Sequence, residues 1–449
     1  MTKKTPDPLI SRIAKTVIHN YGGRFRYVVP KMGWYHYTGT RWIPDHDGTR
    51  LLEKVRSVTH AMHKRAAIAN DSDTRKAIDR LCNARGYDLI AREIRIMQGD
   101  VHIDDFDESP LLINVKGKMT MQLGKENVGI LNPASATDYL TKTTGGQYIS
   151  DDTEYRTQLR GSAFLRFLKH AHPNRDTRRF IQKHAGTGLL GQAQIVAVFH
   201  RGKGHNGKSP YHKIIEHALG TYAQAAPERL FTERETKSHD LAALRGVRYL
   251  SVPELPRNAY WKEALFKGIT GGDPIRGSEK YKGDVQFNSA MTVSVNTNNL
   301  PRLRGGDYAT ARRIAVVFWP NTFDDRDLID EILMKELDIV FSWLVRGLKL
   351  WYAEGLEFPP EVRKATDAYL QERNPVAQWI AEVCVREPGH VEYGSDLHDD
   401  FLRWEREKFP NSTPMNTKKF AELLDECEVS PGKRRNNRRT RVGLRMTFW

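Results

Sequence analysis

The chain has 449 residues, a formal net charge of +15 and 39% hydrophobic residues, a composition that excludes a disordered polar chain. Its three cysteines are far apart and form no C-x-x-C pair, which argues against a disulfide framework or a zinc ribbon, and no apolar run has membrane-spanning length. We therefore expect a cytoplasmic protein of about three domains with no membrane partner, whose positive charge suits a polyanion such as nucleic acid.

The N-terminal part alternates strand-like and helical patterns. We expect a hairpin over 24–45, helices from about 50 to 100, a second hairpin over 110–126 and helices over 162–191. These patterns predict an α+β domain over residues 1–150, followed by a helical linker over 151–185.

A phosphate-binding motif lies in "FHRGKGHNGKSPYHKII" (199–215). Gly202, four residues and then Gly207-Lys208-Ser209 fit G-x-x-x-x-G-K-[ST]. The apolar run "QIVAVF" (194–199) precedes this loop and helical spacing follows it, as the motif requires. The glycines, Gly204 included, allow backbone N–H groups to face an anion, while Lys208 would reach the phosphates and Ser209 would bind Mg²⁺. The sequence therefore predicts an ATP–Mg²⁺ site.

Three further apolar runs lie next to groups that suit phosphate chemistry. The run "VRYLSV" (247–252) leads to Glu254, placed as the acid that orders Mg²⁺ or polarises the attacking water. "MTVSVNT" (291–297) leads to Asn298, whose amide can position that water, and the pair Arg312 and Arg313 comes just before a strand at 314. With the strand at 194, these runs predict an α/β fold: a P-loop sheet with helices on both faces, within residues 186–372.

The tail, residues 373–449, is basic. Helical patterns at 375–385, 394–409 and 416–427 precede "GKRRNNRRTRVGLRMTFW", which alternates basic and apolar residues as a two-stranded wing would. Three helices and a basic ribbon predict a winged-helix domain, with the third helix in a major groove and the wing on phosphates.

The segments "GKGHNGKS", "VPEL", "KGITGGDPI", "VNTNNLPRL" and "RRIAVVFWP" together resemble the superfamily III helicases, in the branch of the primase–helicases of phages, plasmids and poxviruses. Asn206 fits this branch, which typically reads G-x-x-x-N-G-K-S, and "TGGDPI" (270–275) is the most diagnostic segment. The resemblance implies an AAA+-like core in which Glu254 is the Walker-B acid and Asn298 the sensor. It also implies that Arg312 or Arg313 acts on the nucleotide of a neighbouring subunit.

The resemblance further implies a hairpin that points into the pore of a ring and grips DNA. Here it reads "RGSEKYKGDVQF" (276–287), and the DNA-binding candidates are Arg276, Lys280, Tyr281 and Lys282. Two positions depart from the family pattern: Pro253 stands where a second Walker-B acid is frequent, and Ser278-Glu279 where an Arg pair is frequent. Larger relatives carry an N-terminal primase with a carboxylate pair for two metals. The one acidic cluster in the N-terminal third of this chain, "HIDDFDES" (102–109), indicates a surface loop instead, so we expect no primase activity from this chain.

The expected function is an ATP-driven, ring-forming DNA helicase, with a hexamer as the expected ring, that serves the replication of a phage or mobile element in the host cytoplasm or nucleoid. Its expected partners are single-stranded and forked DNA and further copies of the chain, with a primase or polymerase as a candidate partner. Two alternatives stay open: a DNA-stimulated ATPase that loads or translocates without unwinding, and an origin-binding initiator whose ATP site is regulatory.

Overall fold

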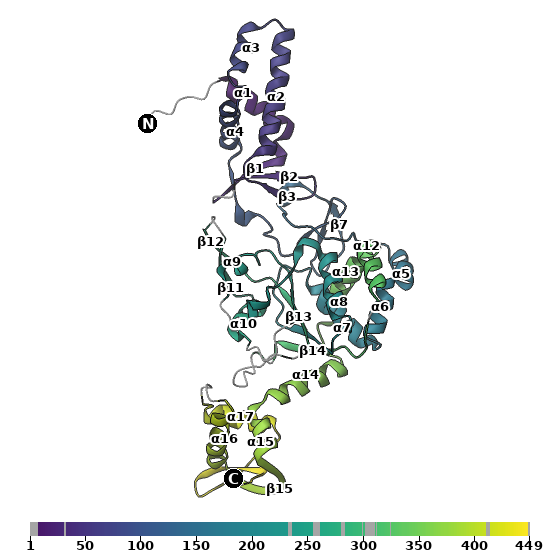
Figure 1. The fold of residues 1–449 in the computed structure, drawn as a ribbon, viewed down its shortest axis with the longest axis vertical. Helices are drawn as coiled ribbons and strands as arrows, with labels where there is room; N and C mark the ends of the chain where they lie inside the picture. Colours follow the sequence, from purple (N-terminus) through teal and green to yellow (C-terminus); the bar gives the residue numbers. More distant parts are fainter. Residues whose placement is uncertain are drawn as a thin grey trace.

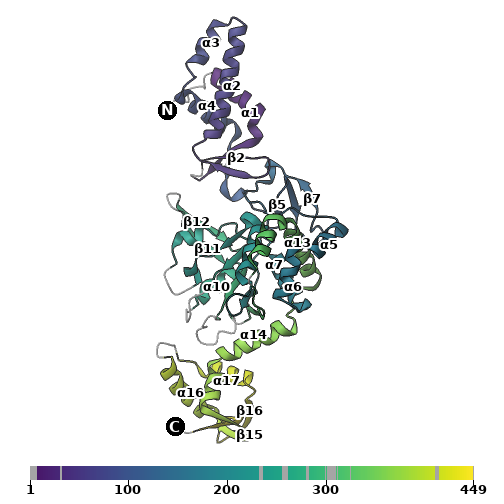
Figure 2. The same ribbon diagram turned by 45° about the vertical axis from the view of Figure 1, so that its right-hand side comes forward.

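The computed structural model describes residues 8–30, 33–231, 236–254, 261–279, 283–298, 300, 310, 312–323, 325–409 and 414–447. It is a mixed α/β protein of elongated shape, with an N-terminal part at one end, a C-terminal part at the other and a larger central part between them (Figure 1). A view turned by 45° shows the same three parts in the same order (Figure 2).

The N-terminal part combines a small sheet with a helical bundle. Its elements are α1 (Pro8–Tyr21), β1 (Phe25–Val29), β2 (Gly33–Tyr37), β3 (Trp42–Asp45), α2 (Thr49–Ile68), α3 (Ser72–Asp79), α4 (Ala84–Gln98) and β4 (Asp100–His102). The strand order is β3-β2-β1-β4, with β4 parallel to β1, so the expected hairpin is part of a four-stranded sheet. Leu51, Val55 and Val58 follow one face of α2 and are buried against α1 and α4, as helical spacing requires.

A second small sheet follows, built from β5 (Leu112–Val115), β6 (Met119–Gln122) and β7 (Leu131–Pro133). Val115 pairs with Met119 across the turn expected at Lys116-Gly117. Its apolar side chains, among them Ile113 and Met121, join the main hydrophobic cluster of the central part. This sheet is therefore packed onto the central part, although it lies within the range expected for the N-terminal domain.

The central part contains a five-stranded sheet in the order β14-β8-β13-β10-β9, with all neighbouring strands parallel. Its strands are β8 (Ala197–Arg201), β9 (Ala223–Ala225), β10 (Tyr249–Val252), β13 (Thr292–Thr297) and β14 (Ile314–Phe318). Four of them confirm strands expected from apolar runs, whereas β9 was not expected, since three residues give no periodic signal.

Alternate residues of these strands enter two separate hydrophobic clusters. In β8, Val198 belongs to one cluster, and Ala197 and Phe199 belong to the other. Because successive side chains of a strand point to opposite faces, the sheet is buried on both sides, which explains why its strands read as continuous apolar runs.

Helices cover the two faces differently. One face carries α6 (Ala163–Ala171), α7 (Arg175–Thr187), α8 (Lys208–Leu219) and α13 (Leu337–Glu354), with α5 (Asp152–Gly161) and α12 (Arg326–Lys335) beside them. The other face carries α10 (Glu263–Gly271) and the hairpin of β11 (Pro274–Glu279) and β12 (Gly283–Asn288), against which α9 (Ser238–Ala242) packs. The hairpin and the group α5 to α7 thus lie on opposite sides of the sheet, as both ribbon views show (Figures 1 and 2).

The C-terminal part follows the connecting helix α14 (Pro360–Arg373) and has its own hydrophobic cluster. Its elements are α15 (Pro375–Val383), β15 (Cys384–Tyr393), α16 (Gly394–Lys408), α17 (Thr417–Glu426), β16 (Ser430–Arg435) and β17 (Arg438–Met446). The three expected helices and the expected two-stranded ribbon are present, and β15 adds a third strand in the order β15-β17-β16. Among the described residues, no helix is long and apolar enough to cross a membrane.

Candidate nucleotide site

The loop between β8 and α8 curls tightly around its own side chains. Gly207 has a φ of +85° and His205 a φ of +56°, left-handed conformations that turn successive backbone N–H groups toward one side. A Cβ atom at Gly202 would lie 1.9 Å from Asn206 Nδ2, so this position must be glycine while Asn206 is folded under the loop. No comparable contact restricts Gly204, where a Cβ would meet nothing within 4 Å.

Lys208 is the first residue of α8, and its side chain is buried under the loop. Its ammonium donates hydrogen bonds to Gly202 O (2.9 Å), Asn206 Oδ1 (2.8 Å) and Asn298 Oδ1 (3.0 Å). Burial lowers the pKa of Lys208, and the carboxylate of Glu254 acts in the opposite direction. Since all three hydrogen-bond acceptors are neutral, they position the ammonium without neutralising its charge.

The carboxyl ends of β10 and β13 bring two predicted site residues to this lysine. Glu254 follows β10, Asn298 follows β13, and Asn298 Nδ2 donates to Glu254 Oε1. The single amide of Asn298 therefore connects the ammonium of Lys208 to the carboxylate of Glu254. Parallel strands place these residues at the same edge of the sheet, although 44 to 90 positions separate the bonded pairs along the chain.

The structure adds Asn296, a residue that the sequence patterns did not single out. Its Nδ2 donates to Ser209 Oγ at 2.9 Å, which fixes the hydroxyl predicted to bind Mg²⁺. The signal that could have found it is a polar residue near the end of a strand otherwise buried, two positions before Asn298.

The donors and acceptors at this edge fit a nucleoside triphosphate with a divalent cation. A buried ammonium, a loop with left-handed turns and a helix N-terminus favour phosphate, while a hydroxyl and a carboxylate favour Mg²⁺. Asn206 Nδ2 and Asn296 Oδ1 are buried and have no hydrogen-bond partner among the described residues. These two atoms are further polar groups that a bound ligand could satisfy.

The predicted pair Arg312 and Arg313 lies elsewhere. Both residues come just before β14, which runs parallel to β8, so they lie at the amino edge of the sheet and the loop lies at the carboxyl edge. The five residues of β14 span about 17 Å, so neither guanidinium is brought to the site of its own chain. Arg313 donates to Thr270 Oγ1 at 3.1 Å, whereas Arg312 is exposed beside α14.

The hairpin predicted to bind DNA is present as β11 and β12. Its antiparallel pairing runs from Pro274 opposite Asn288 at one end to Glu279 opposite Gly283 at the other. Arg276 is exposed on it and donates to Gln286 Oε1 at 3.0 Å. Lys280, Tyr281 and Lys282 lie outside the described residues.

Four histidines are buried behind the loop, on the face of the sheet that α7 and α8 cover: His172, His184, His200 and His212. Burial lowers the pKa of His172 and His212 to about 3 and that of His184 to about 4. His200 accepts from Trp319 Nε1 (3.0 Å) and contacts Ser294 Oγ (3.1 Å), and burial also holds its pKa well below the usual value. All four are neutral at pH 7. No group of three or more His, Cys, Asp or Glu side chains among the described residues has a metal-binding arrangement.

Comparisons with known proteins agree with the motifs. The family described as "D5 N terminal like" matches residues 14–182. "Putative helicase 022R" of frog virus 3 (isolate Goorha) is 25% identical over 279 residues, which cover 56% of this chain and 28% of that protein. "Putative helicase L207/L206" of Acanthamoeba polyphaga mimivirus is 22% identical over 452 residues, which cover 90% of this chain and 46% of that protein. The chain spans less than half the length of these curated relatives.

Among solved structures, the A form of the apo NrS-1 C terminal region aligns with 98% of this chain and 100% of its own length. The identity is 10% and the TM-score is 0.47, so this likeness carries no further argument. The family match, over residues 14–182, lies outside the short motifs around Lys208. Together with the viral relatives it confirms that this chain resembles the D5-like primase–helicase branch of superfamily III.

Proposed function

We propose that this chain is an ATP-dependent DNA helicase of viral or mobile-element replication. The observation that carries this proposal is the continuous contact from Lys208 through Asn298 to Glu254, at the carboxyl edge of a parallel sheet and beside a phosphate loop. A site that only bound nucleotide would need the loop and the lysine. The added carboxylate and amide are the groups that hydrolysis requires.

Each side chain then has a distinct part in the reaction. Lys208 would bind the β- and γ-phosphates of ATP. Ser209, held by Asn296, would join Glu254 in holding Mg²⁺, which would supply charge neutralisation on the phosphates. Glu254 accepts the proton of the attacking water. Asn298 orients Glu254. Because Asn298 also accepts from Lys208, a movement of Lys208 on phosphate binding would shift the position of the Glu254 carboxylate.

We further propose that copies of this chain assemble into a ring, with a hexamer as the expected size. Arg312 and Arg313 support it, because they lie at the edge of the sheet opposite to the nucleotide loop and suit a site on the next subunit. The hairpin of β11 and β12 would face the pore and move one DNA strand. For the domains, we propose an N-terminal α+β domain over 1–150, whose β5–β7 sheet packs onto the core, and a helical linker over 151–185, which packs against the core sheet. An AAA+-like core over 186–372 and a winged helix over 373–449 follow.

The winged-helix proposal rests on the C-terminal part. Helices α15, α16 and α17 share one hydrophobic cluster with the three-stranded sheet, and the turn between β16 and β17 exposes a run of basic residues. This is the element content of a winged helix, and its proposed ligand is duplex DNA.

Two substitutions test the central proposal. Lys208→Ala should lose nucleotide binding, since among the described residues it supplies the one ammonium buried under the loop. Glu254→Gln should bind a fluorescent ATP analogue like the wild type and lose about 10²–10⁴-fold in hydrolysis, the usual size of a general-base effect. A matched control is Glu216→Gln on α8, a carboxylate that contacts Ser251 and is placed away from the loop.

Unwinding of a labelled fork is the second measurement, because it separates the helicase from the alternatives. Hydrolysis by Glu254→Gln at the wild-type rate would show that the acid is misassigned. DNA-stimulated hydrolysis by the wild type without strand separation would favour a loader or translocase over a helicase.

A further inference from the structure

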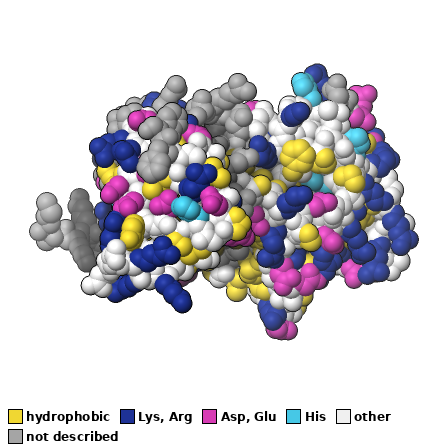
Figure 3. Space-filling model, turned by 90° about the horizontal axis from the view of Figure 1, so that it is seen from below, with side chains coloured by type: hydrophobic (Ala, Val, Ile, Leu, Met, Phe, Trp, Pro, Cys, Tyr) yellow, Lys and Arg dark blue, Asp and Glu magenta, His cyan; other side chains and the backbone are white. Residues whose placement is uncertain are grey.

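A cavity of about 570 Å³ opens between α5, α6, α7 and α13 and is rich in basic side chains. One carboxylate, that of Asp152, lines it, together with six cationic residues: Arg156, Arg175, Arg178, Arg179, Arg346 and Lys349. Seen from below, Lys and Arg side chains are frequent along the right-hand edge of the molecule, the side on which Figure 1 draws α5 and α6 (Figure 3).

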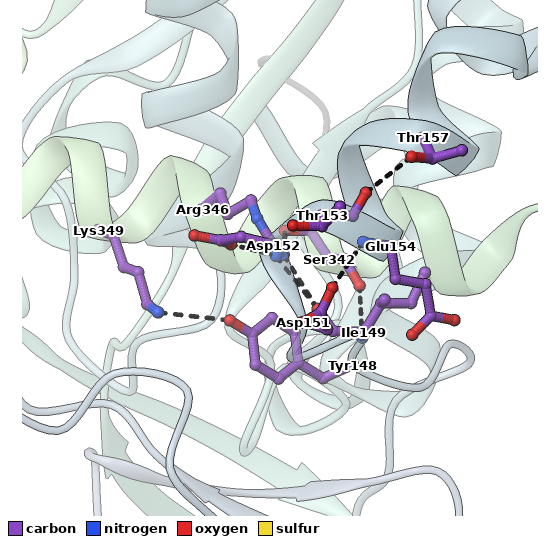
Figure 4. A network of polar contacts seen from close by, with 10 residues as sticks. All are labelled: Tyr148, Ile149, Asp151, Asp152, Thr153, Glu154, Thr157, Ser342, Arg346 and Lys349. Carbon is purple, nitrogen blue, oxygen red and sulfur yellow. Dashed lines mark hydrogen bonds and ion pairs between the residues drawn. The ribbon is translucent and has the colours of Figure 1, made fainter.

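Two of these cations are engaged in holding the helices together. Arg346 of α13 donates to Asp152 Oδ1 at 2.7 Å and to Ile149 O at 3.2 Å, and its guanidinium lies 3.7 Å from the centre of the Tyr155 ring. Figure 4 shows the hydrogen bonds of Arg346 on α13 to Asp152 and Ile149 at the start of α5. Arg179 is paired with Glu354, with Nε 3.0 Å from Oε2. The carboxylates of these two pairs, Asp152 and Glu354, are thus already bound.

The other four cations have no ion pair among the described residues. Lys349 contacts the Tyr148 hydroxyl at 3.3 Å, and Arg178 donates to backbone carbonyls, Pro173 O among them at 2.7 Å. Arg156 and Arg175 are exposed, with no hydrogen bond to a described side chain. Burial and the neighbouring charge of Arg175 both lower the pKa of Arg178. Crowded like charges repel one another, and an anion placed among them would remove this cost.

The anion that fits is phosphate. Guanidinium groups bind phosphate oxygens in pairs of parallel hydrogen bonds, and several of them along one open cavity match a chain of phosphates better than a single small anion. Arg156 comes from α5, Arg175 from α7 and Lys349 from α13, so the cations are spread around the opening.

The position of the cavity decides which strand could occupy it. It lies on the face of the sheet covered by α6, α7 and α13, whereas the hairpin of β11 and β12 lies on the other face (Figures 1 and 2). We propose that this cavity binds the phosphates of a nucleic acid strand distinct from the strand that the hairpin contacts. In the helicase proposed above, on which this inference rests, that strand is the one displaced from the pore.

The test variant is Arg156→Gln/Arg175→Gln in the full chain, because these two residues have no structural partner in the described part. Arg160→Gln/Lys169→Gln is the matched control: it removes the same charge from exposed positions on α5 and α6 that do not line the cavity. Fluorescence anisotropy with a forked DNA should show about tenfold weaker binding for the test variant at physiological salt. The slope of log affinity against log salt should also fall by about 1.4, or ~0.7 for each lost contact to a single strand. The control should bind like the wild type.

A fork with neutral methylphosphonate linkages identifies the strand. Placing them in the displaced tail should weaken wild-type binding and abolish the difference between the wild type and the test variant, whereas placing them in the other tail should preserve that difference. Equal affinity of test and control variants, with a wild type that binds forks and hydrolyses ATP, overturns this inference and leaves the proposed function intact. A wild type without ATPase activity refutes the proposed function instead.

A free anion is the competing occupant. If sodium tripolyphosphate raises the melting temperature of the wild type but not of the test variant, while both bind the fork equally, the cavity takes a small phosphate compound and the strand assignment is wrong.

Discussion

Asn298 touches both charged groups of the candidate nucleotide site. Its carbonyl accepts from Lys208 and its amide nitrogen donates to Glu254. An amide is suited to this position because it offers a donor and an acceptor at once, which a carboxylate or an ammonium does not. The lysine and the acid are therefore held at a fixed separation by one side chain, and a change at residue 298 would disturb both.

Buried histidines add a pH dependence at the residue scale. The folded-state pKa of His212, about 3, lies below the ordinary value of 6.5. Between these two pH values the unfolded chain binds a proton that the folded chain does not. The contribution of the neutral histidine to the free energy of unfolding is therefore fully present above pH 6.5 and is lost as the pH decreases toward the folded-state pKa. The loss is about 1.4 kcal/mol per pH unit for each such histidine. His172 and His184 act in the same direction.

His212→Phe should therefore make the melting temperature less dependent on pH between 7 and 5. Neither ring nitrogen of His212 has a hydrogen-bond partner among the described residues, so an apolar ring of similar shape should not destabilise the protein at pH 7. His217→Gln, at an exposed position on the same helix, is the control and should follow the wild type. An unchanged pH dependence in His212→Phe would mean that His212 is protonated in the folded protein.

At the scale of elements, we expect the proposed wing of the C-terminal part, the turn between β16 and β17, to bind polyanions better than α17 does. The turn between β16 and β17 exposes the run 433–439, "KRRNNRR", which has five basic residues and no acid. Asn436 and Asn437 both have positive φ (49° and 62°), as a two-residue hairpin turn requires. By contrast, the exposed face of α17 carries Lys418 but also Glu422 and Glu426, whose charges would repel the phosphates that flank a major groove.

We expect the wing to contribute more to duplex binding than the third helix, although the tail sequence by itself suggested both. Lys433→Ala/Arg434→Ala/Arg435→Ala should weaken binding of a DNA duplex and reduce the salt slope by up to about 2.7, at ~0.9 for each phosphate contact. Lys418→Ala/Lys419→Ala should have a smaller effect. A titration over a range of salt concentrations measures both, and a larger loss from the helix variant would contradict this order.

At the scale of the whole molecule, the two edges of the central sheet carry different groups of predicted site residues. The carboxyl edge holds Lys208, Glu254 and Asn298, and the amino edge holds Arg312 and Arg313. An arginine that acts on a nucleotide from this position must act on another subunit, which couples hydrolysis to assembly.

Mixing experiments test this arrangement. Lys208→Ala has an intact arginine pair and Arg312→Ala or Arg313→Ala has an intact loop, so mixed rings should recover part of the ATPase activity that each protein lacks alone. The sequence leaves the choice between Arg312 and Arg313 open, and in the structure Arg313 donates to Thr270 Oγ1. Recovery with only one of the two arginine variants identifies the residue that acts between subunits. Mixed rings that form but stay inactive with both variants would argue against action between subunits.

The sequence alone determined the features that local chemistry encodes. The phosphate loop needs glycines, a lysine and a hydroxyl within eight positions, and four buried strands are visible because each is a continuous apolar run. The helices of the C-terminal part also follow from spacing. These patterns depend on residues close together in the chain, so no knowledge of the pairing of strands is needed.

Only the tertiary structure decided which distant side chains meet. Strand order brings Asn296 to Ser209 and Asn298 to both Lys208 and Glu254, and helix packing joins Arg346 to Asp152, 194 positions apart. The short strand β9, the four buried histidines and the cationic cavity had no local signal either, since each arises where separate elements pack. Periodicity tells which face of an element is buried. The partner of that face is set by the whole fold, because the hydrophobic effect is non-directional and a hydrophobic surface can be buried against any apolar surface of matching shape.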